Sequence, residues 1–359
     1  MEYSHNVNST HYLLTAQVPF LDFVRCMATL QIVLFHYVCA IPLSDRYVLL
    51  WGREGVALFF MISGAGLVNK YYYSMSTLQF YKRRLLGIFI PFWIAYLGVS
   101  IWKFFANSFT WTPSGLPLRN GIFTFLGIDG LLAVYGIPTY YQIGEWYLGV
   151  LLIVYLLFPI WIKVFRKCPT LLLLILFALR ILISTNNIFS PLPVCYNPIT
   201  ALSNFSVGAY SILLLSKAKK SNTKKEGIGI LVAGAVFLFA GLILGHRYGL
   251  QDYGELLTGV ALFAIYYILA PLTQKIYIHS FCQFVCYISY EVFLLHHVII
   301  HKTAPIVSSN YSISHALIGA ILTSVVIAAA AYNLKKCSEY VTQQIKSFGT
   351  VLINYSNTL

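Results

Sequence analysis

Ten apolar stretches of about 20 residues each constrain this fold more than any other feature of the chain. Wound as an α-helix, such a stretch spans the roughly 30 Å hydrocarbon core of a bilayer. The composition agrees, because only 10% of the residues are charged, against about a quarter in soluble domains. We therefore expect an all-α integral membrane protein with about ten transmembrane helices. Their expected limits are 18–40, 47–69, 85–106, 143–163, 170–187, 196–216, 227–246, 255–272, 285–304 and 314–334.

The basic residues predict how these helices are oriented. With the N-terminus in the cytoplasm, most lysines and arginines outside the spans fall in inner loops, as at 82–84, 163–167 and 217–225. The positive-inside rule then places both termini in the cytoplasm. We expect a cytoplasmic tail over residues 1–17, a membrane domain over 18–334 and a second cytoplasmic tail over 335–359. The expected location is the cell membrane, which the chain crosses many times.

The net charge of +13 is explained by basic loops that face anionic lipid headgroups, so no nucleic-acid partner is expected. The seven cysteines form no metal-binding pattern. His297 and His301 stand one helical turn apart, a spacing that can bind a metal, but no HExxH pattern or third ligand accompanies them. The sequence therefore predicts no metal ion, and it leaves the oligomeric state open.

Two basic residues interrupt the first apolar stretch. Arg25 and His36 are eleven positions apart, which at about 100° per residue is three turns plus roughly 20°. Both side chains therefore face the same side of the helix, about 16.5 Å apart along its axis. Ionisable groups at membrane depth usually face a partner, a cavity or a pathway. This pair predicts a polar seam that runs into the bilayer.

A long connecting segment lies between the third and fourth stretches, over residues 107–142, and is expected outside the cell. It is rich in glycine, proline and aromatic residues, and loops of this length are often functional. Tyr135, Tyr140 and Tyr141 can form a stacking surface for a sugar ring. The alternative is an aromatic belt at the membrane interface.

Five segments together resemble the membrane acyltransferase 3 family, in its stand-alone form without a fused esterase-like domain. The similar segments are LDFVRCMATLQIVLFHY, GVALFFMISGAGL, FYKRRLLGIFIPFW, EWYLGVLLIVYLLFP and SYEVFLLHH. They follow the family's order through most of the chain, and the first keeps its Arg-x10-His spacing. Two departures stand out. The family's Arg-x-x-Arg pattern is broken, since Gly87 follows Arg84 by three residues, and its acidic position in the second segment is Ala57.

The resemblance implies transfer of an acyl group, usually acetyl from acetyl-CoA, to a carbohydrate hydroxyl. His36 would act as the general base or carry the acyl group itself. Arg25 would hold the donor pyrophosphate or polarise the thioester carbonyl. Asp22, three residues earlier, can aim the guanidinium, and the two can equally form a structural ion pair.

The remaining candidates divide between donor and acceptor. Lys82, Arg83, Arg84 and Ser63 are assigned to CoA; the alternatives are a topology signal for the charges and close helix packing for Ser63. For the acceptor, the assigned residues are Glu145, Trp146, Tyr290 and His296. An interfacial anchor is the competing interpretation for Trp146.

We therefore expect an enzyme that moves an acetyl group from cytoplasmic acetyl-CoA to a hydroxyl of an extracytoplasmic or lipid-linked glycan. Two alternatives remain open from the sequence. One is a proton-coupled transporter that uses a seam of Arg25, His36, Glu291 and His296. The other is a catalytically silent member that scaffolds a polysaccharide assembly complex. Apart from that choice, a pairing of Glu291 with Arg25 is expected.

Overall fold

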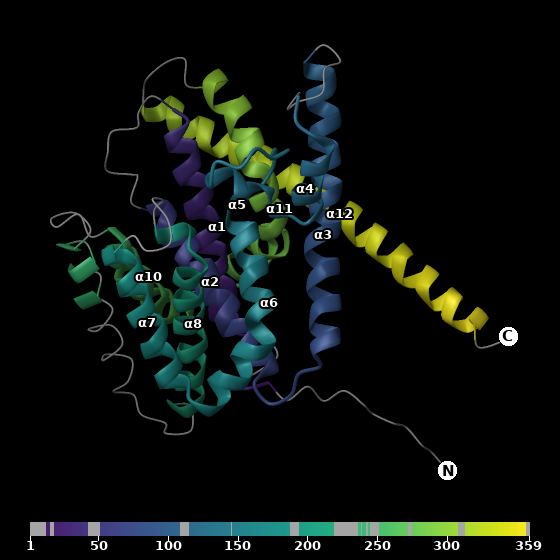
Figure 1. The fold of residues 1–359 in the computed structure, drawn as a ribbon. Coiled ribbons are helices and arrows are strands. Elements are labelled where there is room, and N and C mark those ends of the chain that lie inside the picture. Colours follow the sequence, from purple (N-terminus) through teal and green to yellow (C-terminus); the bar gives the residue numbers. More distant parts are fainter. Residues whose placement is uncertain are drawn as a thin grey trace. The chain divides into compact units, whose positions relative to one another are not determined.

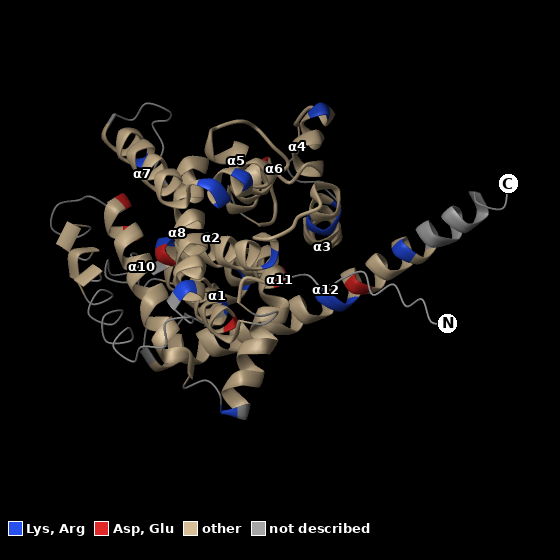
Figure 2. Cartoon of the chain, turned by 90° about the horizontal axis from the view of Figure 1, so that it is seen from below, with Lys and Arg blue, Asp and Glu red and all other residues tan. Residues whose placement is uncertain are grey.

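The structure of this 359-residue chain is a computed structural model. The described residues are 12–14, 18–41, 51–107, 115–144, 146–186, 194–218, 236–237, 239–241, 243–244, 251–271, 275–307 and 313–356. Helices joined by turns account for these residues, and no β-strand occurs among them (Figure 1). Charged residues are sparse along the helices (Figure 2). The expected all-α fold is confirmed.

The long helices follow the predicted stretches closely in most places. They are α1 (Pro19–Cys39), α2 (Trp51–Tyr71), α3 (Thr77–Ala106), α6 (Trp146–Lys167), α7 (Pro169–Asn186), α8 (Pro198–Ala218), α10 (Gln251–Leu269), α11 (Ile276–Val307) and α12 (Ile313–Ser356). The short ones are η1 (Leu118–Asn120), α4 (Gly121–Phe125), α5 (Asp129–Val134) and η2 (Val194–Tyr196).

Seven of the described helices, α1, α3, α6, α8, α10, α11 and α12, are long and apolar enough to cross a membrane. The chain is therefore a multi-pass membrane protein. Helix α2 is less apolar because Arg53 and Glu54 stand in its first turn and Lys70 in its last, while α7 forms a shorter apolar helix. The predicted stretch 227–246 lies almost wholly outside the described residues. The count of ten spans and the side of each terminus stay predictions.

Three helix boundaries differ clearly from those expected, and one of them is the start of α11 at Ile276 instead of residue 285. Helix α3 begins at Thr77 instead of residue 85, so the basic residues 82–84 belong to its first turns rather than to a loop. Helix α12 continues to Ser356, well beyond the expected limit at 334. Hydropathy marks where a helix is apolar, whereas the backbone hydrogen bonds of a helix continue through polar residues. A polar extension is therefore invisible to an apolar-stretch criterion.

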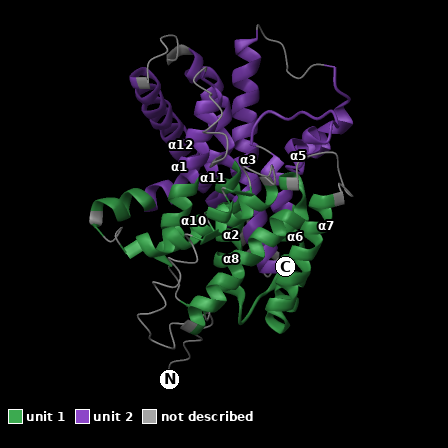
Figure 3. Cartoon of the chain, turned by 90° about the vertical axis from the view of Figure 1, so that its left-hand side faces the viewer, with its two compact units in different colours: residues 1–28, 53–77, 153–282 green, residues 29–52, 78–152, 283–359 purple. Residues whose placement is uncertain are grey.

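The chain forms two compact units (Figure 3). Unit 1 contains residues 1–28, 53–77 and 153–282, and unit 2 contains residues 29–52, 78–152 and 283–359. The division falls within α1, after Ala28. The predicted pair on α1 is thus shared between the units, with Arg25 in unit 1 and His36 in unit 2.

Unit 1 is built around a close crossing of α2 and α8. A Cβ atom placed on Gly64 would lie 1.9 Å from the carbonyl oxygen of Phe205, and one on Gly208 would lie 1.9 Å from that of Met61. The two backbones therefore touch, as small residues permit at helix contacts in membranes. Only glycine fits at either position without moving a helix.

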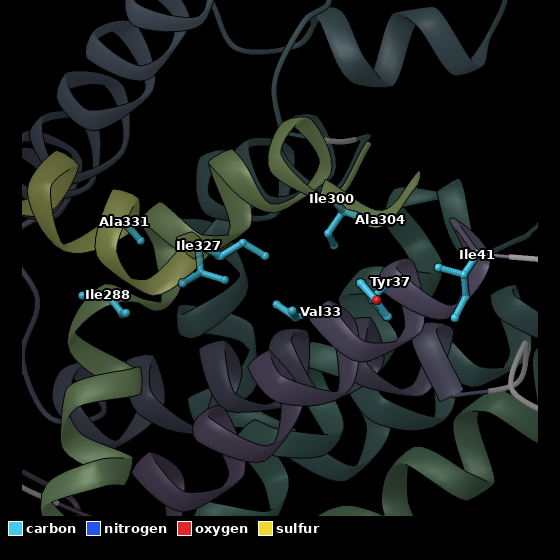
Figure 4. Close-up of a cluster of buried hydrophobic side chains, with 9 residues drawn as sticks. Val33, Tyr37, Ile41, Ile288, Ile300, Ala304, Ile327 and Ala331 are labelled. Atoms are coloured by element: carbon cyan, nitrogen blue, oxygen red, sulfur yellow. The ribbon is translucent and has the colours of Figure 1, made fainter. Parts of the chain in front are cut away.

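Unit 2 holds the second half of α1 against α11 and α12. The contact is a buried apolar cluster (Figure 4) of Val33, Tyr37, Ile41, Ile288, Val292, Ile300, Ala304, Ile327 and Ala331. Val33 and Tyr37 lie four residues apart on one face of α1, and Ile41, just beyond the end of the helix, continues this stripe. This stripe fixes the height of α1 against α11, and with it the level at which His36 meets that helix.

Candidate functional site

Three histidines from two helices form one cluster in unit 2. The ring centroids of His36 and His297 are 4.0 Å apart, those of His296 and His297 are 4.6 Å apart, and those of His36 and His296 are 5.0 Å apart. One ring nitrogen from each lies within 4.8 Å of the others. His296 is fully buried, and the other two are partly buried. His36 and His296, which the sequence analysis assigned to the site, thus lie together with a third histidine, His297.

The protonation pattern of His296 follows from its hydrogen bonds. Its Nδ1 atom lies 2.9 Å from the carbonyl oxygen of Phe293 and 3.1 Å from that of Val292. A carbonyl oxygen only accepts hydrogen bonds, so Nδ1 carries the proton and donates it. The lone pair of a neutral His296 is therefore on Nε2. This backbone contact fixes both the tautomer and the orientation of the ring.

Aromatic side chains surround the histidines. Phe35 packs edge-on against the ring of His36, at 4.9 Å between centroids. Phe293 lies 6.4 Å from His296 and 5.3 Å from Tyr147 at the start of α6. Low polarity around a base or nucleophile strengthens the electrostatic interactions it makes. The cluster therefore sits in a setting suited to chemistry at an imidazole.

Tyr290, predicted to bind the acceptor, lies beside this aromatic wall. Its ring stacks on Phe293, with centroids 6.1 Å apart and planes 21° apart. Its hydroxyl donates a hydrogen bond to the carbonyl oxygen of Ile88, at 3.0 Å. This bond ties α11 to α3 within unit 2. Tyr290 thus links these two helices, and its contact with an acceptor stays a prediction.

Arg25 is partly buried in unit 1. Helix α1 runs unbroken from Pro19 to Cys39, so the predicted register between Arg25 and His36 holds. Asp22 interacts electrostatically with Arg25 and also with His279 of α11. The expected neighbour of the guanidinium is therefore present. Whether Arg25 also binds a donor stays a prediction.

The donor candidates fall in different units. Lys82 and Arg83 are exposed at the start of α3 in unit 2, and Arg84 lies 5.8 Å above the ring of Phe80. Ser63 is partly buried on α2 in unit 1, next to the backbone contact at Gly64. Exposed cations are available to phosphate groups, whereas Ser63 adjoins a helix contact. Binding of CoA by the basic residues 82–84 and by Ser63 therefore stays a prediction.

Trp146 was predicted to bind the acceptor, and Glu291 was predicted to belong to the polar seam. Trp146 begins α6, with its ring 6.5 Å from that of Tyr147. Glu291 is 1% exposed and its Oε1 lies 3.3 Å from Nζ of Lys335 on α12. The partner of Glu291 within unit 2 is thus Lys335, while the expected pairing with Arg25 joins different units and stays a prediction. Glu145 lies outside the described residues.

Residues 115–144 form an ordered segment against α3. The Tyr96 hydroxyl donates to the carbonyl oxygen of Tyr140 at 2.7 Å, and the Gln142 amide donates to Tyr96 and to Ser100 at 3.2 Å. A cavity of about 450 Å³ opens here. Its lining consists of Lys103, Ala133, Gly136, Ile137, Pro138, Thr139, Tyr141 and Gln142. Of the predicted tyrosines, Tyr141 lines this cavity and Tyr140 anchors the segment.

Asp129 is a buried carboxyl group in this segment that sequence reasoning missed. It is 2% exposed, and its Oδ1 accepts a hydrogen bond from the Gly130 N–H at 2.9 Å. Thr139, which lines the cavity, donates to the Asp129 carbonyl oxygen at 3.1 Å. Burial raises the pKa of Asp129 to about 6. An aspartate in a Gly-rich loop is usually a solvated turn residue, so the sequence carried no signal of this burial.

The comparisons with known proteins give one positive finding. A family model described as an acyltransferase domain matches residues 18–333, a range that contains Arg25 and all three clustered histidines. No curated protein and no solved structure matches the chain.

Proposed function

This chain belongs to the membrane acyltransferase 3 family, and from that premise we propose that it transfers an acetyl group from acetyl-CoA to a hydroxyl of a cell-surface or lipid-linked glycan. The acyltransferase class follows from the family, whereas the acetyl donor and the glycan acceptor are the proposal. The observation that carries it is the position of His36. This imidazole meets two others inside a membrane helix bundle, on the face of α1 that also bears Arg25.

In the proposed reaction His36 acts on the acceptor hydroxyl. The imidazole accepts the hydroxyl proton as the oxygen attacks the thioester carbonyl, the C–S bond breaks, and the departing CoA sulfur takes the proton from the imidazolium. The products are the O-acetyl ester and free CoA. Transient acetylation of His36 itself gives the same products by two steps.

The donor would approach along α1. Arg25 and His36 are about 16.5 Å apart along the helix axis, so one molecule that engages both must be long and anionic at one end. CoA has this form, with phosphates at one end and a thioester at the other. Lys82 and Arg83 supply exposed cations suited to its nucleotide phosphates, and Arg84 adds a partly buried one. A cytoplasmic donor site follows if the predicted orientation holds.

The acceptor would use the segment 115–144. Its cavity presents an aromatic ring at Tyr141 together with hydrogen-bonding groups at Thr139 and Gln142. Sugars are bound by this combination of a flat apolar face and polar groups. The segment also reaches α11 directly, because the Gly144 N–H donates to the carbonyl oxygen of Leu294 at 3.4 Å. That contact stands two residues from His296. Trp146 and Tyr290 are further acceptor candidates.

The transporter alternative is less well supported. Its proposed seam needs Glu291 to exchange protons or substrate, but the Glu291 carboxylate is held by Lys335 at 3.3 Å. Family membership also favours acyl transfer. A relay transporter has no need to consume a CoA thioester, so the two functions differ in their products.

Sealed, uniformly oriented vesicles test the proposal. With acetyl-CoA inside right-side-out vesicles, we expect acetylation of glycan supplied outside, and with acetyl-CoA outside we expect none. Labelling of single cysteines, Asn120→Cys and Lys220→Cys in a cysteine-free background, reports the orientation. Equal transfer from either face would overturn the transmembrane mechanism. Absence of any CoA release or acetyl transfer by active-site-intact protein would overturn the function itself.

A further inference from the structure

We propose that His36, His296 and His297 bind a divalent transition-metal ion of the zinc class, and that its binding inhibits acyl transfer. The sequence pattern gave no metal site because it held no third ligand near His297 and His301. The structure supplies one from a different helix, since α1 brings His36 within 4.0 Å of His297 between ring centroids. The inhibition rests on the proposed function, whereas the metal site does not.

The nitrogen positions suit a small coordination shell. One nitrogen from each histidine lies within 4.8 Å of the other two. Zinc binds imidazole nitrogen at about 2.0–2.1 Å, usually with tetrahedral geometry, which places ligand nitrogens about 3.4 Å apart. Small rotations of the rings bridge that difference. Three protein ligands then leave the fourth position for water or another exchangeable group.

His296 already has the arrangement of a metal ligand. Histidines that bind metals almost always donate their other ring N–H to a carboxylate, a backbone carbonyl or water. The Nδ1 of His296 makes this contact with the carbonyl oxygens of Val292 and Phe293, at 3.1 and 2.9 Å. Its Nε2 therefore has the lone pair that coordination needs. The ring is preoriented by its own helix.

The chemistry of the ligands selects the metal. Three imidazoles suit zinc, copper or nickel, whereas magnesium and calcium prefer oxygen ligands. The nearest acidic residue along α11, Glu291, is held by Lys335 at 3.3 Å. The site therefore selects borderline metals. Because coordination uses a lone pair of His36, a bound ion prevents this imidazole from accepting the acceptor proton or an acyl group.

Direct binding is measured on the full-length protein in detergent or nanodiscs, purified with a tag that contains no histidine. After incubation with Zn²⁺ and gel filtration, we expect about one ion per chain by atomic emission, and Co²⁺ should give the visible absorption of a tetrahedral site. Loss of a residue that only hydrogen-bonds to a metal ligand typically lowers metal affinity about 10–100-fold. His296→Ala and His297→Ala each remove a ligand itself and should lower zinc affinity by at least as much. His301→Ala, one turn away on the same helix, should retain the ion.

Thermal melting and gel filtration identify any variant that fails to fold, and His297→Gln is the milder replacement at that position. Wild-type protein that keeps no ion, or histidine variants that keep it fully, would overturn the site. The activity assay is separate: zinc should suppress transfer and EDTA should restore it. Transfer that requires zinc and is lost in EDTA would overturn the inhibitory role. If no transfer occurs under any condition, the proposed function fails while the binding result stands.

Discussion

Arg180 in unit 1 and the histidine cluster in unit 2 are both ionisable groups within apolar helices, but they are held in different ways. Arg180 is 1% exposed on α7. Its Nη1 donates to Asn204 at 2.9 Å and Ser203 at 3.2 Å, and its Nη2 donates to the Asp252 carbonyl oxygen at 2.7 Å. These bonds join α7, α8 and α10. The histidines instead contact each other ring against ring, and His296 is also held by its own backbone.

The difference shows that burial of an ionisable group indicates a partner rather than a function. A guanidinium keeps its charge in proteins and has donors only, so fixed acceptors turn it into a structural tie. An imidazole can hold or release a proton near neutral pH, and a neighbouring imidazole does not commit it to one state. The nature of the partners, more than depth in the membrane, separates the two regions.

The largest expected effect is on catalysis in unit 2. His36→Ala should lower the rate of acetyl transfer by about 10²–10⁴ because the general base is lost, and further if His36 carries the acyl group. The measurement is CoA release and glycan acetylation at equal amounts of folded protein. His301→Ala is the matched control and should behave as wild type. Full activity of His36→Ala would show that the histidine cluster is not catalytic and that it does not differ from Arg180 in this respect.

In unit 1 the corresponding change should affect stability alone. Arg180→Ala leaves the acceptors on Ser203, Asn204 and Asp252 without this donor, and each buried acceptor left unsatisfied costs about 1–3 kcal/mol. We expect a large drop in melting temperature, or loss of folded protein, with unchanged turnover per folded molecule. Thermal melts and activity on the same preparation check this. A variant that folds normally but loses turnover would place Arg180 in the chemistry instead.

Asp129 provides a third case, a buried carboxyl group whose effect on the stability of the fold depends on pH. Its pKa rises from an ordinary value of 3.8 to about 6, so the folded state binds more protons between these values. Stability should therefore fall as pH rises through this interval, by up to about 3 kcal/mol. Hydrogen exchange of residues 115–144 between pH 4 and pH 7 measures this, and Asp129→Asn should flatten the profile. An unchanged profile in the variant would assign the pH dependence to other groups.

A contact without charge tests whether unit 1 depends on helix packing as well. Gly64→Ala places a methyl 1.9 Å from the Phe205 carbonyl oxygen, and overpacking of this kind costs about 1–3 kcal/mol. Gly66→Ala on the same helix meets nothing within 4 Å and is the matched control. Melting temperatures should fall for the first variant and stay level for the second. Equal melting temperatures would contradict the close crossing of α2 and α8.

The smallest expected effect concerns the donor in unit 2. Neutralising Lys82, Arg83 and Arg84 together should weaken CoA binding about tenfold, or about 1.4 kcal/mol, because exposed charge-assisted contacts are lost. KM for acetyl-CoA should rise while kcat stays close to wild type. Isothermal titration with CoA measures the binding directly. Normal CoA affinity in a correctly inserted variant would reduce these charges to a topology signal.

The sequence alone determined the features that depend on local chemistry. Membrane helices such as α6 and α7 were located within a few residues because each segment must be apolar along its own length. The shared face of Arg25 and His36 also followed, since helical periodicity fixes it whatever surrounds the helix. The family resemblance named the acyltransferase class for the same reason, because its motifs are short and continuous.

Only the tertiary structure decided which distant residues meet. His297 joined His36, Glu291 paired with Lys335, and Asp129 became buried, although nothing beside them in the chain required it. Helix-to-helix contacts arise from the packing of whole faces, such as the stripe that Val33 and Tyr37 form on α1. Such packing depends on side-chain shape at positions far apart in sequence. A periodic pattern within one helix records which face is used, but not which residue lies across from it.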